Sequence, residues 1–529
     1  MSINKIHITL ITMLAVPPCS VLAQTPSQNY VRTVTMLDAY GTDSIQAVQY
    51  YNGLGRPTLS VATAGGNGET ACTLTTYDGA GREKRRYLPV PASGLDYIPV
   101  SGVTSMGLFY LDDGFFTESH YDALDRVTAV DIAGDTWRQA GKQDRTEHLA
   151  NTASDQVLHF EAPEDGSYSL TLPENTAFEY YPEGTLAKAV SYDADNRSTA
   201  VFTDLLGRKI MERTAAGDTY YVYNDLGQLR FVLTPAFNKI SQEKTIYAYE
   251  YRYDNRGRVV WKKLPGAECV QYWYDSADRM AYMRDTALGN RYRFCLYDRF
   301  GRLCVQGTCS DGNRDGSVLS ATSYTSGSGG VCSTGYSAPY SISDPQLEIV
   351  NYYDTYEFIG NNITSAMPAL TIGQEQRQHA IGYLTGQVVY ATGGEALGTV
   401  TVYDRKGQAV RTVRKGLGGH IEDVSTEYTF TGAVDSTEVR VGVGYGGDFT
   451  AKTGYTYRYG KKTKMSLSVS HGGTAQSRDT EYSYDAIGRL STKGRQTIRN
   501  SKSYCSYTYD VHGWLKSVSS GGFREDLYY

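Results

Sequence analysis

One six-residue phrase, Tyr-Asp-x-x-Gly-Arg, recurs along most of this chain of 529 residues. Clear neighbouring copies lie about 21 to 31 residues apart, which is the length of one supersecondary unit per repeat. A phrase repeated in this way describes an architecture before it describes an active site. Strict copies occupy residues 77–82, 253–258, 297–302 and 484–489, and looser copies begin at Tyr51, Tyr121, Tyr192, Tyr223, Tyr274, Tyr403 and Tyr509.

Each copy predicts the corner of a β-hairpin. The approach alternates, as in residues 247–253, so its tyrosines share one face of a sheet. The Asp can accept hydrogen bonds from backbone N–H groups of the turn, and the Gly supplies the positive φ of a type I turn closed by a G1 bulge. Asp125 and Asn196 replace that Gly, and both residue types tolerate left-handed geometry. The phrase is therefore structural and offers no catalytic candidates.

The long gaps at 121–192 and 297–403 are predicted to hold decayed repeats or insertions.

The N-terminus has the pattern of an export signal, residues 1–23. Lys5 precedes an apolar stretch over residues 6–16, and the small residues before Gln24 suit cleavage after Ala23. A mildly hydrophobic tail is the alternative. The apolar stretch is too short to span a bilayer, and Pro17 and Pro18 before Cys19 make a poor lipoprotein signal. We expect an exported protein, secreted or on the outer cell surface, with no integral membrane segment after cleavage.

Seven cysteines remain once Cys19 is removed. In an oxidising compartment a disulfide such as Cys304–Cys309 or Cys309–Cys332 is plausible, with buried free thiols as the alternative. Their spacing, with Cys295 included, lacks the paired pattern of a zinc site. The formal net charge of −6 is spread over interspersed acids and bases, which argues against a nucleic-acid partner.

The repeats resemble the YD-repeat proteins of the RHS (rearrangement hot spot) class, which include bacterial toxin shells and teneurin-like proteins. Residues 30 to about 140 also resemble an uncharacterised N-terminal domain that precedes such repeats in exported bacterial proteins. Its sharpest segment is residues 48–57, and residues 109–110, 117–122 and 134–137 continue the match. The resemblance covers most of the chain after residue 23.

The resemblance implies an all-β fold, a ribbon of YD-repeat hairpins that spirals into a partial shell, an open or incomplete cocoon. In family members such a shell can enclose a C-terminal toxin domain or present a recognition surface. This chain ends shortly after the copy at Tyr509 without the family's shell-closing motif, self-cleavage segment or toxin tail, so we expect a truncated front part. The predicted organisation is a signal (1–23), an N-terminal domain of unknown function with the first repeats (24–150), YD repeats (151–304), a Gly/Ser-rich insertion loop (305–345) and degenerate and C-terminal repeats (346–529).

Three other segments have competing interpretations. Residues 311–316 match the first half of a calcium loop, but Thr322 stands where a bidentate acid belongs, so a plain turn is favoured. Residues 374–379 predict a short helix or a polar surface connection. Residues 442–447 fit GxGxxG but lack a following helix signal, so a strand with glycine bends is favoured.

We expect no catalytic, cofactor-binding or metal-binding residues, because no hydrolase signature is present. The sequence thus predicts a non-enzymatic shell or scaffold of an RHS-type polymorphic-toxin or cell-contact system, with a C-terminal toxin or cargo encoded downstream as partner. The alternative is a cell-surface adhesin or carbohydrate-binding protein, in which tryptophans stack on a glycan, although Trp on strands is more often core. A polysaccharide-acting enzyme is the remote alternative. Single scattered histidines favour surface or turn roles; these are His120, His148, His159, His379, His420, His471 and His512, and the tryptophans are Trp137, Trp261, Trp273 and Trp514.

Overall fold

The computed structural model describes residues 25, 27–162, 180–239, 244–312, 314, 318–327, 329–360, 366–391, 395–443, 447–496 and 501–529. The predicted export signal lies outside these residues. Antiparallel strands dominate, as the repeats predict, and they join into one 33-stranded sheet with a separate two-stranded sheet beside it.

The strands of the first half of the chain are short because each reverses at a corner. They are β1 (Asn29–Met36), β2 (Ser44–Tyr51), β3 (Pro57–Thr63), β4 (Thr70–Tyr77), β5 (Glu83–Tyr87), β6 (Val90–Ala92), β7 (Phe116–Tyr121), β8 (Val127–Asp131), β9 (Gln143–Ala150), β10 (Ala187–Tyr192), β11 (Ser198–Thr203), β12 (Lys209–Thr214), β13 (Gly217–Tyr223), β14 (Leu229–Leu233), β15 (Ala248–Tyr253), β16 (Val259–Lys263), β17 (Cys269–Tyr274) and β18 (Met280–Arg284).

The strands of the second half lengthen toward its middle. They are β19 (Tyr292–Tyr297), β20 (Leu303–Cys309), β21 (Asp311–Gly312), β22 (Ile342–Ser343), β23 (Gln346–Tyr353), β24 (Leu384–Tyr390), β25 (Ala396–Tyr403), β26 (Ala409–Lys415), β27 (Ile421–Tyr428), β28 (Val434–Val443), β29 (Gly447–Arg458), β30 (Lys461–His471), β31 (Thr474–Tyr484), β32 (Leu490–Gln496), β33 (Lys502–Tyr509), β34 (Leu515–Ser520) and β35 (Phe523–Asp526). The α-helices are single turns, α1 (Val100–Thr104), α2 (Asp135–Gln139), α3 (Pro235–Lys239) and α4 (Gln374–Gln378). Of the two interpretations of residues 374–379, a short helix or a polar surface connection, the structure shows the short helix.

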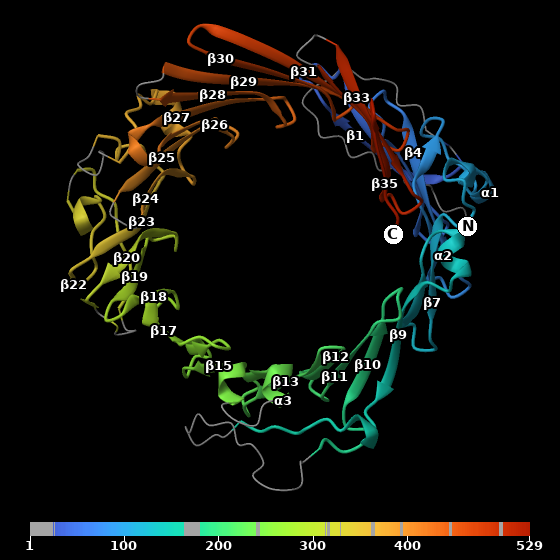
Figure 1. The fold of residues 1–529 in the computed structure, drawn as a ribbon, viewed down its shortest axis with the longest axis horizontal. Helices are drawn as coiled ribbons and strands as arrows, with labels where there is room; N and C mark the ends of the chain where they lie inside the picture. The colour runs from blue at the N-terminus through green and yellow to red at the C-terminus, as the bar shows by residue number, and fades with distance from the viewer. Residues whose placement is uncertain are drawn as a thin grey trace, which may run out of the picture.

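The sheet is one ribbon that curves into a ring. Consecutive strands pair as antiparallel neighbours from β1 to β35, apart from detours at β6 and at the β21–β22 hairpin. Figure 1 shows this ribbon coming round so that the last strands lie beside the first. Among the described residues β1 pairs with β2 alone and β35 with β34 alone, so the hydrogen-bonded ladder stays open. The fold class is therefore as predicted, an all-β ribbon forming an open shell wall.

The corners have the predicted geometry. At residues 77–82, Asp78 Oδ1 accepts hydrogen bonds from the backbone N–H groups of Ala80 and Arg82, at 3.0 and 2.9 Å. Gly81 has a φ of 83°, and the strand register shifts at Tyr77, as a G1 bulge requires. Asp125 and Asn196 reach φ values of 62° and 60°, so the left-handed geometry predicted for both is confirmed.

The long gap at 297–403 does hold a decayed repeat, and two more lie between residues 403 and 484, where the sequence phrase did not identify them. Tyr353 stands at a corner between β23 and β24, and Asp354 there adopts a φ of 66°. Tyr428 ends β27, and Tyr457 is the penultimate residue of β29. The Tyr428 corner retains Gly432 four residues on, with a φ of 87°, and that spacing is the signal that could have found it.

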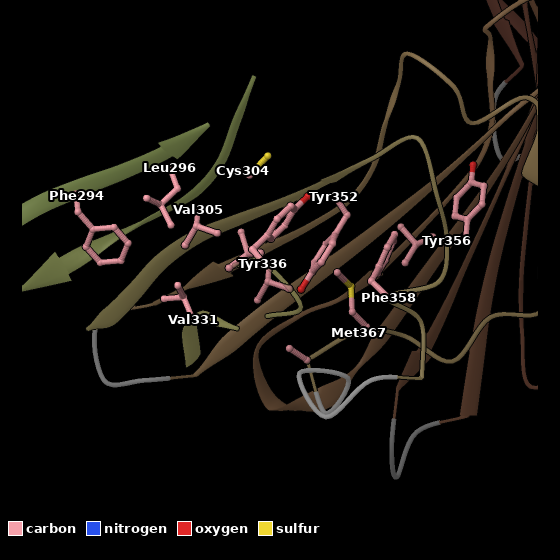
Figure 2. Close-up of a cluster of buried hydrophobic side chains, with 14 of the residues drawn as sticks. Phe294, Leu296, Cys304, Val305, Val331, Tyr336, Tyr352, Tyr356, Phe358 and Met367 are labelled. Carbon is pink, nitrogen blue, oxygen red and sulfur yellow. The ribbon is translucent and has the colours of Figure 1, made fainter. Parts of the chain in front are cut away.

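Three hydrophobic clusters lie along the ribbon where loops cover it. The largest contains Tyr336, Tyr352 and Phe358, whose rings stack in a row with centroids 5.5 and 4.3 Å apart (Figure 2). Its presence shows that the insertion predicted over residues 305–345 packs on the sheet and is not an exposed loop throughout. Val331 and Tyr336 of that insertion are buried in the cluster, and the Tyr336 hydroxyl donates to the Asn351 carbonyl at 2.7 Å. The high Gly and Ser content suggested a loop, but a few apolar side chains of the insertion pack against the sheet.

Candidate functional site

Most of the described repeats are fastened to the one before by their tyrosine. The hydroxyl donates to the backbone carbonyl of the residue that begins the preceding return strand, as from Tyr274 to Val259 at 2.6 Å and from Tyr509 to Leu490 at 2.8 Å. The decayed repeats keep this bond, including the one from Tyr428 to Ala409 at 3.0 Å. A phenol with an apolar body and a polar tip meets this need, which accounts for part of the excess of Tyr (46) over Phe (14) in the chain. The same bond runs from Tyr77 to Pro57, Tyr121 to Glu83, Tyr253 to Leu229, Tyr297 to Met280 and Tyr484 to Lys462.

In several repeats the arginine reaches forward to the next corner, as from Arg82, Arg258, Arg279 and Arg302. Arg258 binds Asp254 Oδ2 of its own turn at 2.7 Å and Asp278 Oδ1 of the following turn at 2.6 Å. Its guanidinium also lies over the Tyr274 ring, 4.7 Å from the centroid. At most of the described corners the repeat residues therefore form an inter-repeat lock, in which these side chains hold one hairpin to the next.

The electrostatics of the turn aspartates suit this structural role. The backbone N–H of Arg82 and then its guanidinium hold the pKa of Asp78 below its ordinary value. Asp275 is almost completely buried; burial alone would raise its pKa, but hydrogen bonds from the side chain and backbone of Arg279 outweigh that effect and lower it. Carboxyls with lowered pKa values stay ionised, which is the opposite of what a general acid needs.

The seven cysteines of the described residues are free thiols, so the predicted disulfides are wrong. Cys304 and Cys309 lie on the same strand, β20, where an extended chain advances about 3.3 Å per residue and separates them far beyond disulfide reach. Cys332 lies exposed in the insertion while Cys309 is buried in the large cluster. Burial raises the pKa of four thiols to about 11; these are Cys72, Cys295, Cys304 and Cys309.

Two of the segments with competing interpretations fall partly outside the described residues, namely 311–316 and 442–447. Within the first, Asp311 Oδ1 pairs with Arg314 at 2.8 Å, and Thr322 is buried with its hydroxyl donating to the Ser337 carbonyl at 2.6 Å. In the second, Gly442 belongs to β28 and Gly447 begins β29, which agrees with a strand prediction. The described part of the chain contains no cluster of three metal-ligating side chains and no helix long and apolar enough to cross a membrane.

The structure brings together two tryptophans and one histidine from opposite ends of the chain. Trp137 of α2 lies 4.7 Å from the His512 ring and 5.6 Å from Trp514, between centroids, and His512 stacks on Trp514 at 4.6 Å. Trp514 remains 39% exposed. Trp273 packs against the large cluster, and Trp261 lies under the Arg252 guanidinium at 4.0 Å. No motif in the sequence signalled the Trp137–His512–Trp514 contact, because it depends on the ring coming round on itself.

This contact belongs to a larger interface, here called the seam, between residues 109–137 and the corners at 485–489 and 510–514. His512 Nε2 lies 2.8 Å from the Ala133 carbonyl oxygen, across 379 residues of chain. Val511 packs against the N-terminal cluster, and the Arg489 guanidinium lies 5.7 Å from the Phe109 ring centroid. The seam is built from side chains and single carbonyls, since β1 and β35 do not pair with each other.

The two faces of the ribbon differ where no loop covers it. On β28–β30, Val439, Phe449, Leu467 and Val469 lie on one face because opposed residues in the register share a face. The other face carries serines. It is the face on which the large cluster lies, because a series of directly opposed residues leads from one strand to the next, from Val400 of that cluster to Val413, Asp423, Arg440, Thr450 and Ser470. Ile342 of β22 packs on that cluster, and Figure 1 places β22 on the outside of the ring. The apolar face, here called the inner wall, therefore looks inward and is only partly buried.

Comparison with known proteins identifies one family model and several solved structures. Residues 24–150 match a domain of unknown function, DUF6443. No curated protein matches the sequence. The chain is similar to the crystal structure of TcdB2-TccC3 without its hypervariable C-terminal region, with 16% identity and a TM-score of 0.47 over 92% of this chain and 22% of that one. The structure of TcdB2-TccC3-TEV is 16% identical with a TM-score of 0.46, over 96% of this chain and 24% of that one. The structure of TcdB2-TccC3-Cdc42 is 15% identical with a TM-score of 0.44, over 92% of this chain and 23% of that one. The chain spans less than a quarter of the length of these structures.

Proposed function

We propose that this chain is an exported, non-enzymatic wall of an RHS-type shell, working in a toxin-associated or cell-contact system. One observation carries the proposal: the repeat residues most available for chemistry are committed to fastening one hairpin to the next around a ring. A wall of this kind gives a container its shape and leaves any activity to what it encloses. Its partner is a polypeptide cargo encoded downstream.

The inner wall supports a role in holding polypeptide. Val439, Phe449, Leu467 and Val469 present partly exposed apolar surface toward the interior of the ring, while the outer face of the same strands is lined with serines. Apolar surface of this kind favours contact with unfolded chain, whose own apolar side chains are accessible. A folded, polar cargo would gain little from it.

Retention of unfolded chain tests the cargo role. The full protein is incubated with a carboxymethylated, permanently unfolded polypeptide, and co-elution on size exclusion is measured. We expect retention by the wild type, a severalfold loss in Val469→Lys and little change in Ser468→Lys, which alters the outer face of the same strand. Equal behaviour of the two variants, or no retention by the wild type, would contradict the cargo role.

Export is tested separately. N-terminal sequencing of protein recovered from the medium or cell surface should begin at Gln24, because the small residues before it suit a signal peptidase. Protein found only inside the cell with Met1 retained would contradict export without bearing on the shell.

A further inference from the structure

The inner wall carries unmatched positive charge where it crosses β30–β33. Opposed residues share a face, so the register extends the inner wall from Leu467 of β30 across to β33. Lys493 and Arg495 of this region are exposed, whereas Lys462 and Arg478 are half-buried. Within the described part of the chain none of these four cations forms an ion pair. Their faces follow from the opposed pairs Tyr457–Lys462, Leu467–Arg478, Tyr482–Lys493 and Thr480–Arg495.

The acids of the same strands lie on the other face of the ribbon. β30–β33 contain two of them, Asp479 and Glu481, and the register places both on the outer face. There they pair with Lys464 at 2.8 Å and with Lys502 at 2.7 Å. The outer face of these strands is therefore balanced in charge, and the inner face keeps a surplus of cations.

This surplus is local and lies among aromatic rings. On β26 and β27 the same inner face carries Arg414 opposite Glu422, and these two side chains form an ion pair at 3.2 Å. On β30 the Lys462 ammonium lies 5.3 Å from the Tyr455 ring centroid and 5.0 Å from that of Tyr482. Cations that repel one another on one face, with apolar and aromatic surface beside them, favour an anionic partner that also has apolar groups.

We propose that the inner wall over β30–β33 binds an acidic, extended segment of polypeptide. Carboxylates of the bound chain pair with the four cations, and its apolar side chains contact Leu467, Val469 and the tyrosine rings. The inference rests on the proposed cargo role and adds the chemistry by which the wall selects its cargo. Single-stranded nucleic acid also suits cations interleaved with aromatic rings, but it gains little from the aliphatic side chains beside them.

Binding is measured on the full protein by fluorescence anisotropy of two labelled, unstructured peptides. Both are built of Gly, Ser and Leu, with Glu at the remaining positions of one and Gln at the same positions of the other. Each exposed ion pair changes affinity by a few-fold at most, so several of them predict about a tenfold preference for the Glu peptide. The preference should shrink between about 0.1 M and about 1 M NaCl, because the Debye length falls from about 10 to about 3 Å.

Paired variants on opposite faces separate the site from general charge. Lys493→Gln with Arg495→Gln should weaken binding of the Glu peptide severalfold and leave the Gln peptide unchanged, whereas Lys493→Arg with Arg495→Lys should keep the preference. Lys464→Gln with Lys502→Gln is the matched control, because it removes the same charge from the outer face of the same strands and should also keep the preference. Circular dichroism confirms that each variant is folded.

The outcomes distinguish this inference from the cargo role. Equal affinity of the wild type for the two peptides would overturn the acidic preference and leave the cargo role standing, whereas no binding of either peptide would contradict both. An equal loss in the inner and outer variants, or tighter binding of a single-stranded oligonucleotide than of the Glu peptide, would also overturn the inference.

Discussion

Asp275 gives the sharpest test of the inter-repeat lock. Its buried carboxylate accepts hydrogen bonds from Arg279 Nε at 2.9 Å and Nη2 at 2.7 Å, and from the Ser320 backbone at 3.1 Å. Asp275→Asn keeps the oxygen that closes the turn, as the natural Asn52 does with the N–H of Arg56 at 3.0 Å. The substitution removes the ion pair and faces a guanidinium with an amide donor.

Breaking a buried pair by removing one partner costs about 3–5 kcal/mol. Because Arg279 is 19% exposed and keeps a contact with the Asp298 carbonyl at 3.3 Å, we expect the lower end, about 3 kcal/mol. Hydrogen exchange of the β17–β18 hairpin measures this as a change in local opening free energy. Asp78→Asn removes the same pair from a solvent-exposed turn and should lose less. A loss at Asp275 below about 1 kcal/mol, or no larger than at Asp78, would refute the reasoning that burial governs the strength of the lock.

Three further outcomes follow from the same geometry. Gly301→Ala should destabilise its hairpin by about 1–2 kcal/mol in local hydrogen exchange, because its φ of 81° is left-handed although no atom lies within 4 Å of the added Cβ; an unchanged hairpin would contradict this. The pKa of Asp275 is lowered, so its stabilisation is full above the ordinary carboxyl value and is lost as pH falls through the folded value; protection of β17–β18 should hold from pH 7 to 5, fall below about pH 4 and lack this step in Asp275→Asn. A maleimide at pH 7.5 should label exposed Cys332 in the native protein, and mass spectrometry should find the four buried thiols unlabelled until denaturant is added: Cys72, Cys295, Cys304 and Cys309.

The wall could be predicted from sequence because its determinants are local. The bond from Asp78 to the turn and the positive φ of Gly81 involve residues within a few positions of each other, and the phrase repeats them often enough to define the hairpins. Tyr353 and Tyr428 escaped because the lock needs only the phenol and a turn of the right shape. The Tyr353 corner keeps Asp354 but lacks the Gly and Arg of the phrase, and the Tyr428 corner keeps Gly432 but lacks the Asp and Arg.

The seam and the insertion could not be predicted because their partners are distant. The contact of His512 with Ala133 depends on the accumulated curvature of the ribbon, which no short pattern encodes. Val331 and Tyr336 are isolated apolar residues in a Gly/Ser-rich segment, so composition indicated a loop. Both side chains are nevertheless buried against the sheet. Disulfides were predicted from the cysteine count and spacing, but the placement of Cys304 and Cys309 on one strand rules out their pairing.

The central claim is that the repeats build one continuous wall that comes round on itself. Electron cryomicroscopy of the purified full chain tests it directly, because class averages show the outline of single molecules. We predict a closed ring, one ribbon thick along most of its circumference, with residues 24–150 against the corners at 485–489 and 510–514. An extended rod, or two compact bodies joined by a linker, would contradict the account.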